Sequence, residues 1–105
     1  MNKDRVIAKF MRDSNNLKEN IEEIYLFGSR VREEERPDSD YDLLIVVNRA
    51  GREFREKIYE VVLDILLETG KLLSLKILSS EEFRKLSKLR TPFMENILKE
   101  GIKIG

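Results

Sequence analysis

The spacing of apolar residues along this chain predicts helices and strands in alternation. Apolar residues at helical spacing open the chain: Val6, Ile7, Phe10 and Met11. The apolar runs at 24–27 and 43–47 predict two strands, and the second lacks polar alternation, as is typical of a central strand. The clearest helix is predicted over 51–69, where one stripe is apolar and Gly70 follows as a terminator.

The last third of the chain adds a strand and two helices to this pattern. Residues 72–78 predict a third strand, and Ser79 with Glu82 has the spacing of a capping box that begins a short helix. Thr91 followed by Pro92 predicts the start of a last helix, and residues 102–104 predict a short edge strand. The order predicts an α/β (α+β) fold, a small mixed sheet packed by helices, with residues 1–105 as a single domain.

Composition then restricts the chemistry that such a domain can perform. The chain of 105 residues contains no Cys and no His, which excludes thiolate nucleophiles, imidazole bases and Cys or His zinc sites. Carboxylates, hydroxyls, Lys and Arg remain, and hard oxygen-liganded metals such as Mg²⁺ or Mn²⁺ suit that set. The net charge of zero argues against direct nucleic-acid binding. No membrane-spanning stretch or signal sequence is recognised, so a cytoplasmic protein without membrane contact is expected.

Candidate functional residues lie at the end of the first predicted strand and the start of the second. Gly28 and Ser29 end the first, and Asp40-Tyr41-Asp42 begins the second after ten intervening residues. If these strands pair antiparallel, both segments lie at one edge of the sheet. Asp40 and Asp42 then share a face, with Cα atoms about 7 Å apart at about 3.3 Å per residue, while Tyr41 points away.

This arrangement suits a metal-bound nucleotide. Gly28 permits close approach of the backbone, and the Ser29 hydroxyl with nearby N–H groups can hold a phosphate. Asp40 and Asp42 are the candidate catalytic residues, as carboxylates that bind the metal ions of two-metal phosphoryl transfer. Arg30, Arg32 and Arg36 can contact phosphates. For Arg32 and Arg36 the alternative is a solvated loop in which they pair with Glu33 to Glu35. Turn chemistry alone also explains either half of the pattern, but its two halves together favour a site.

The pattern Gly-Ser, ten residues, Asp-x-Asp resembles the minimal nucleotidyltransferases of the DNA polymerase β-like superfamily. The resemblance implies a nucleotidyltransferase fold, binding of a nucleoside triphosphate such as ATP with Mg²⁺ or Mn²⁺, and transfer of the monophosphate to an acceptor hydroxyl. By position, Gly28 and Ser29 would hold phosphates, and Asp40 and Asp42 would bind metal. Many such proteins resemble antitoxins encoded beside a helical HEPN ribonuclease toxin, and some modify a tyrosine of that toxin.

One departure from the family pattern concerns a third carboxylate, which active members place on a later strand. The corresponding strand, 72–78, offers Ser74 and Lys76 on its polar face and no acid. Lys76 lies at or beside the expected position, where it would contact a phosphate or simply face solvent. Glu60 and Asp64 are predicted to face solvent on the 51–69 helix and do not replace the acid.

Two functional hypotheses follow from this departure. The first is a metal-dependent transferase acting on a protein or small-molecule hydroxyl. The second is a weakly active or inactive nucleotide-binding antitoxin or regulatory subunit that acts by protein contact. Both expect assembly with a protein partner, either a HEPN-type helical protein or another copy of this chain, because one small sheet forms a shallow site.

Overall fold

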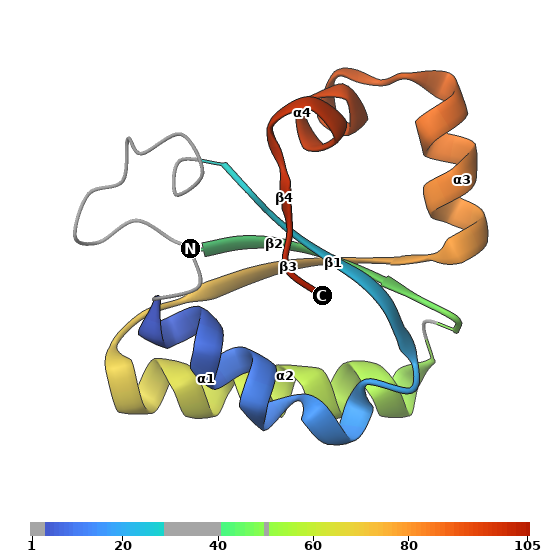
Figure 1. The fold of residues 1–105 in the computed structure, drawn as a ribbon. Coiled ribbons are helices and arrows are strands. Elements are labelled where there is room, and N and C mark those ends of the chain that lie inside the picture. Colours follow the sequence, from blue (N-terminus) through green and yellow to red (C-terminus); the bar gives the residue numbers. More distant parts are fainter. Residues whose placement is uncertain (1–3, 29–40, 50) are drawn as a thin grey trace.

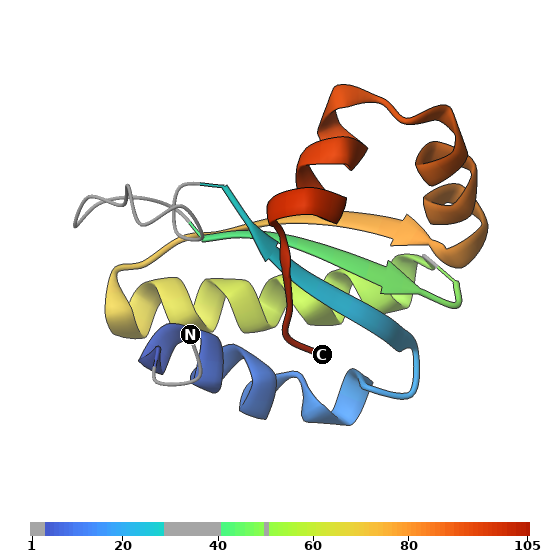
Figure 2. The ribbon, with the colours of Figure 1, turned by 45° about the horizontal axis from the view of Figure 1, so that its top comes forward.

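The computed structural model describes residues 4–28, 41–49 and 51–105, and within them a four-stranded sheet lies between two pairs of helices (Figure 1). Helices α1 and α2 cover one face, and α3 and α4 lie on the other (Figure 2). The elements are α1 (Arg5–Asp13), a 3₁₀ turn (Asn15–Leu17), β1 (Ile21–Phe27), β2 (Tyr41–Val47), α2 (Arg52–Thr69), β3 (Leu73–Ser79), α3 (Ser80–Leu89), α4 (Pro92–Glu100) and β4 (Ile102–Lys103). The predicted mixed sheet packed by helices is confirmed.

The sheet has the strand order β3-β2-β1-β4, which places β2 in the interior. β1 pairs antiparallel with β2 and with β4, whereas β2 and β3 are parallel. The residues of β2 from Leu43 to Val47 are all buried, as expected for a strand covered on both faces. The predicted antiparallel pair and the predicted central strand are therefore both confirmed.

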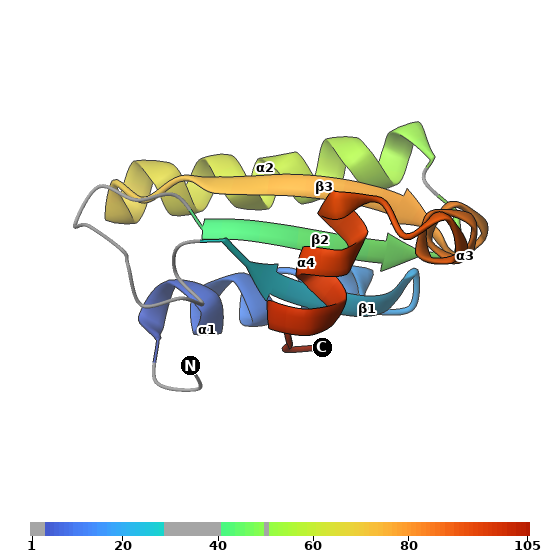
Figure 3. The same ribbon diagram turned by 90° about the horizontal axis from the view of Figure 1, so that it is seen from above.

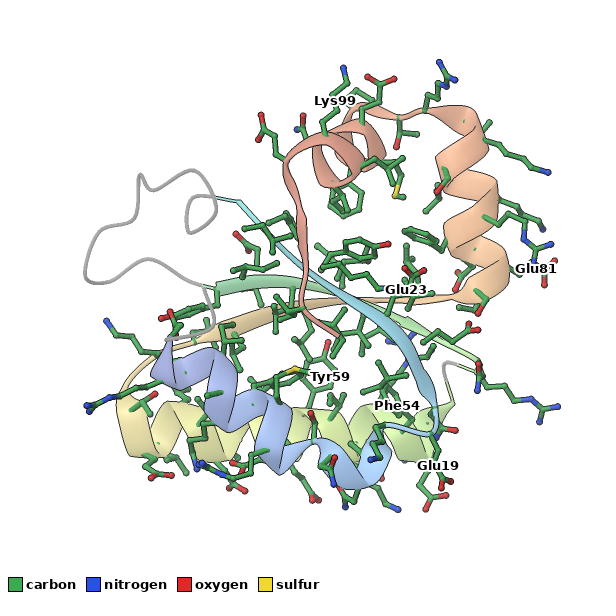
Figure 4. The ribbon with its side chains drawn as sticks, in the orientation of Figure 1. Glu19, Glu23, Phe54, Tyr59, Glu81 and Lys99 are labelled. Atoms are coloured by element: carbon green, nitrogen blue, oxygen red, sulfur yellow. The ribbon has the colours of Figure 1, made fainter. Side chains whose placement is uncertain are left out.

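Most of the core lies between the sheet and helices α1 and α2. From α2, Phe54, Ile58 and Ile65 are buried against this face, and Figure 4 shows Phe54 pointing from α2 toward the sheet. The apolar stripe predicted for this helix is therefore its buried stripe. In the described residues, no helix combines the length and apolar character needed to cross a membrane.

The helix ends follow their sequence signals. The Ser79 hydroxyl accepts a hydrogen bond from the Glu82 N–H at 3.1 Å, and the Glu82 carboxylate accepts one from the Ser79 N–H at 2.9 Å. These two bonds form the predicted capping box. The bond from the Ser79 N–H, and secondarily the Ser79 side chain, lower the pKa of Glu82 because they favour its charged carboxylate. Thr91 caps α4, and Gly70 ends α2 with φ of 75°.

The second face of the sheet is only partly covered. Leu44 and Val46 of β2 pack with Ile97 of α4, while α3 contributes no fully buried residue. Figure 3 shows α4 crossing above the middle of the sheet and α3 lying near the end of β3. Neither helix crosses the first residues of β2 and β3 in this view (Figure 3).

Candidate functional site

Gly28 and Asp42 meet where β1 ends and β2 begins. The register pairs Phe27 with Asp42, which brings the following Gly28 against the Asp42 side chain. Gly28 has φ of 82°, and a Cβ placed on it would lie 3.2 Å from Asp42 Cγ and closer still to Oδ2. Glycine is therefore required here for both backbone conformation and space. The sequence prediction that these two residues share one sheet edge is confirmed.

Asp42 points to the partly covered face of the sheet. Side chains alternate along a strand, so Asp42 shares a face with Leu44 and Val46, which pack toward α4. Its side chain is half-buried. Tyr41 lies on the opposite face, within the core formed with α1 and α2, as the alternation predicted.

Ser74, rather than Lys76, is the β3 residue level with Asp42. The parallel register pairs Asp42 with Ser74 and Leu44 with Lys76. Lys76 is exposed on the same face, two residues further along its strand. Residue spacing within one strand does not reveal register. Here the register is fixed where the Tyr41 N–H donates to the Leu72 carbonyl at 3.0 Å.

The remaining predicted site residues lie outside the residues that the structure describes. They are Ser29, Arg30, Arg32, Arg36 and Asp40. The structure therefore describes the Gly28 and Asp42 halves of the motif together with Ser74 and Lys76. Glu60 and Asp64 are exposed on α2, on the far side of the sheet from Asp42, as predicted.

A hollow of about 210 Å³ adjoins Gly28 on the α4 side of the sheet. Its lining includes Phe27, Phe93 and Asn96, and the two aromatic rings meet edge to face with centroids 5.6 Å apart. Sequence analysis did not identify Phe93 or Asn96 as site residues. Their spacing of three places them on one helix face, but the pattern does not show which strand end that face approaches.

The hard-oxygen groups of this corner are compatible with a divalent cation. Asp42 contributes a carboxylate and Ser74 a hydroxyl from the neighbouring strand, both suitable for Mg²⁺ or Mn²⁺. Among the described residues, no group of three or more acids, histidines or cysteines is placed to hold a metal. Asp40, the other carboxylate predicted to bind metal, lies outside the residues that the structure describes.

Tyr25 lies two residues before Phe27 on β1, on the same face of the sheet, and its hydroxyl is held in the neutral form. Burial, and secondarily the hydrogen bond that its hydroxyl donates to Glu23 Oε2 at 2.6 Å, raise the pKa of Tyr25 to about 12. Figure 4 shows Glu23 on the side of the sheet where α3 and α4 lie. Tyr25 is therefore unsuited to act as a base at neutral pH and serves as packing, stacked on Phe83.

Two solved structures resemble this fold at low sequence identity. The first is a toxin–antitoxin complex with AMP-PNP, with 18% identity, a TM-score of 0.56 and coverage of 93% of this chain and 68% of that one. The second is a mutant of the toxin–antitoxin MntA–HpeT, with 16% identity, a TM-score of 0.54 and coverage of 92% and 68%. At these identities the likeness shows a shared fold. No curated protein matches the chain.

The family model described as polymerase beta, nucleotidyltransferase matches residues 9–105. That span includes every described strand and the contact between Gly28 and Asp42. The chain belongs to the polymerase beta nucleotidyltransferase family.

Proposed function

We propose that this chain is a metal-dependent nucleotidyltransferase that transfers AMP from ATP to an acceptor hydroxyl and releases pyrophosphate. The observation that carries the proposal is the fit between Gly28 and Asp42, in which the absence of a Cβ leaves room for a carboxylate where β1 ends and β2 begins. ATP is the favoured nucleotide because a protein of the same fold has been crystallised with AMP-PNP.

Each site residue has a distinct role in this proposal. Asp40 and Asp42 would hold Mg²⁺ or Mn²⁺, which neutralises phosphate charge during transfer when it is bound. Gly28, Ser29 and Arg30 would donate hydrogen bonds to the triphosphate. Lys76, exposed on the same face, contributes positive charge to a phosphate that extends over β3.

A protein partner is the favoured acceptor. The two structures compared above are toxin–antitoxin assemblies, and Asp42 is only half-buried at its end of the sheet. We therefore propose a helical HEPN-type partner whose tyrosine hydroxyl approaches this corner. A second copy of this chain is the alternative partner.

Titration of the purified protein with ATP, in the presence and absence of Mg²⁺, tests the nucleotide site itself. We expect binding that strengthens by about tenfold or more when Mg²⁺ is present, since the cation offsets the repulsion between carboxylates and phosphates. Absence of detectable ATP binding in either condition would remove the basis of the proposal.

A second candidate function is a nucleotide-binding antitoxin that acts by contact and transfers nothing. The observation that favours it is the polar face of β3, which carries Ser74 and Lys76 and no acid, whereas the family resemblance implies a carboxylate on this strand. In this case the partner would be neutralised equally well by the chain carrying both Asp40→Asn and Asp42→Asn. Loss of neutralisation in that double variant would favour the transferase.

Adding the missing acid distinguishes the two candidates. We expect Ser74→Asp to raise the rate of AMP transfer by about tenfold or more over Ser74→Asn. The substitution places a second carboxylate beside Asp42, on a neighbouring strand about 4.8 Å away. Ser74→Asn is the matched control, with similar size and no charge. The measurement is the rate of label incorporation from α-labelled ATP. Equal rates for the two variants would contradict a catalytic role for this position.

A further inference from the structure

Tyr41, the middle residue of Asp40-Tyr41-Asp42, is anchored in the core on the face opposite to Asp42. It is 4% exposed and belongs to the apolar cluster that α1 and α2 form with the sheet. Its backbone N–H donates to the Leu72 carbonyl at 3.0 Å, so the first residue of β2 is tied to the residue that precedes β3. Both its backbone and its side chain are therefore held.

The Tyr41 hydroxyl reaches a polar partner at the edge of this core. It donates a hydrogen bond to Asp4 Oδ2 at 2.8 Å. The other carboxylate oxygen, Asp4 Oδ1, accepts bonds from the N–H groups of Val6 at 2.8 Å and Ile7 at 3.1 Å. One carboxylate thus caps α1 and holds Tyr41, which joins the start of a helix to the start of the strand that carries Asp42.

We infer that Tyr41 and Asp4 are positioning residues that fix the beginning of β2, and with it Asp42, for metal and nucleotide binding. The inference deepens the proposed function and depends on it for the ligand. The physical reason is that a strand end frays unless something holds it, and Asp42 is the second residue of its strand. A displacement at Tyr41 moves Asp42 directly, because consecutive residues share a peptide plane.

Matched variants separate a positioning role of Tyr41 and Asp4 from a purely structural role. Tyr41→Phe keeps the packed ring and removes the bond to Asp4. Asp4→Ser keeps a residue suited to capping α1, but its shorter side chain does not span to the Tyr41 hydroxyl. Tyr25→Phe is the control, since it removes a similar bond from a sheet tyrosine to a carboxylate, the bond to Glu23, away from the start of β2.

The first readout is ATP affinity in the presence of Mn²⁺, measured by titration. Tyr41→Phe and Asp4→Ser are each expected to weaken it by about tenfold, the scale of losing a hydrogen bond to a charged group, and the double variant no further than either alone. Tyr25→Phe is expected to stay within about twofold of the original protein. ATP affinity unchanged in both Tyr41→Phe and Asp4→Ser would overturn the inference.

The second readout needs no nucleotide and separates failure of this inference from failure of the proposed function. Amide hydrogen exchange at position 41, compared with that of Ile45 in the same strand, reports local opening of the start of β2. Tyr41→Phe is expected to speed this relative exchange by about tenfold. An unchanged ratio would contradict positioning by the pair even if ATP binds, while an increased ratio in a protein that does not bind ATP would count against the nucleotide site alone.

Discussion

Replacement of Gly28 by alanine is expected to abolish measurable ATP binding, with an affinity loss of about a hundredfold or more. Two effects combine in this variant. The backbone at Gly28 has φ of 82°, which costs a residue with a side chain about 1 kcal/mol. In addition, the new Cβ would overlap Asp42 Oδ2, so the carboxylate must leave its position. The second effect is the one that removes the nucleotide and metal site.

Gly70→Ala separates these two effects. Gly70 has nearly the same backbone, with φ of 75°, but nothing lies within 4 Å of a Cβ placed there. Both variants should therefore lose about 1 kcal/mol of unfolding free energy through backbone strain, measured by urea denaturation. ATP affinity, measured by titration, should fall in Gly28→Ala and remain unchanged in Gly70→Ala. Equal affinities in the two variants would show that contact with Asp42 is irrelevant to binding.

Asp42→Asn is expected to remove the dependence of ATP binding on Mg²⁺ and to lower AMP transfer by about a hundredfold or more. The substitution preserves side-chain size and takes away the negative charge that makes a carboxylate a ligand for a hard cation. A loss of a few kcal/mol in stabilisation of the reacting phosphate corresponds to this rate change, at about 1.4 kcal/mol per tenfold. The measurements are titration with ATP at several Mg²⁺ concentrations and label transfer at saturating ATP.

The same chemical change at Asp64 is the matched control for Asp42→Asn. Asp64 is exposed on α2, which covers the opposite face of the sheet. Asp64→Asn should retain both the Mg²⁺ dependence and the transfer rate of the original protein. Retention of Mg²⁺-dependent binding in Asp42→Asn would contradict the assignment of Asp42 as a metal ligand.

The sequence predicted the part of the site that depends on local order along the chain. Gly28 follows one apolar run and Asp42 begins the next, and neighbouring strands commonly pair antiparallel, so their meeting at one edge could be inferred. Side-chain alternation likewise predicted that Tyr41 faces away from Asp42. Capping signals predicted the starts of α3 and α4 because they act within one helical turn.

The register between strands could not be predicted from the sequence patterns. Lys76 was predicted to lie at or beside the position of the third acid, and this stays a prediction, since the register shows only that Ser74 is level with Asp42. The polar face of β3 was predicted correctly, but the alignment of β3 with β2 was not visible in the pattern. β1 also begins at Ile21, earlier than the apolar run, because Ile21 and Glu23 pair with β2 across an irregularity in the register between them.

Contacts between distant segments were also not predicted. Asp4 and Tyr41 are separated by 37 positions, and nothing in either segment identifies the other as its partner. The same holds for Phe93, whose contact with Phe27 depends on where α4 crosses the sheet. These contacts arise from tertiary packing, which the apolar period of a single element does not specify.

The central claim is AMP transfer, and parallel reactions with α-labelled and γ-labelled ATP test it most directly. The chain would be incubated with Mg²⁺ and the protein encoded by the adjacent reading frame, and label on the acceptor would be measured. The account predicts incorporation from α-labelled ATP and none from γ-labelled ATP, with loss of incorporation in Asp42→Asn. Incorporation from γ-labelled ATP, or none from either nucleotide in a preparation that binds ATP, would contradict it.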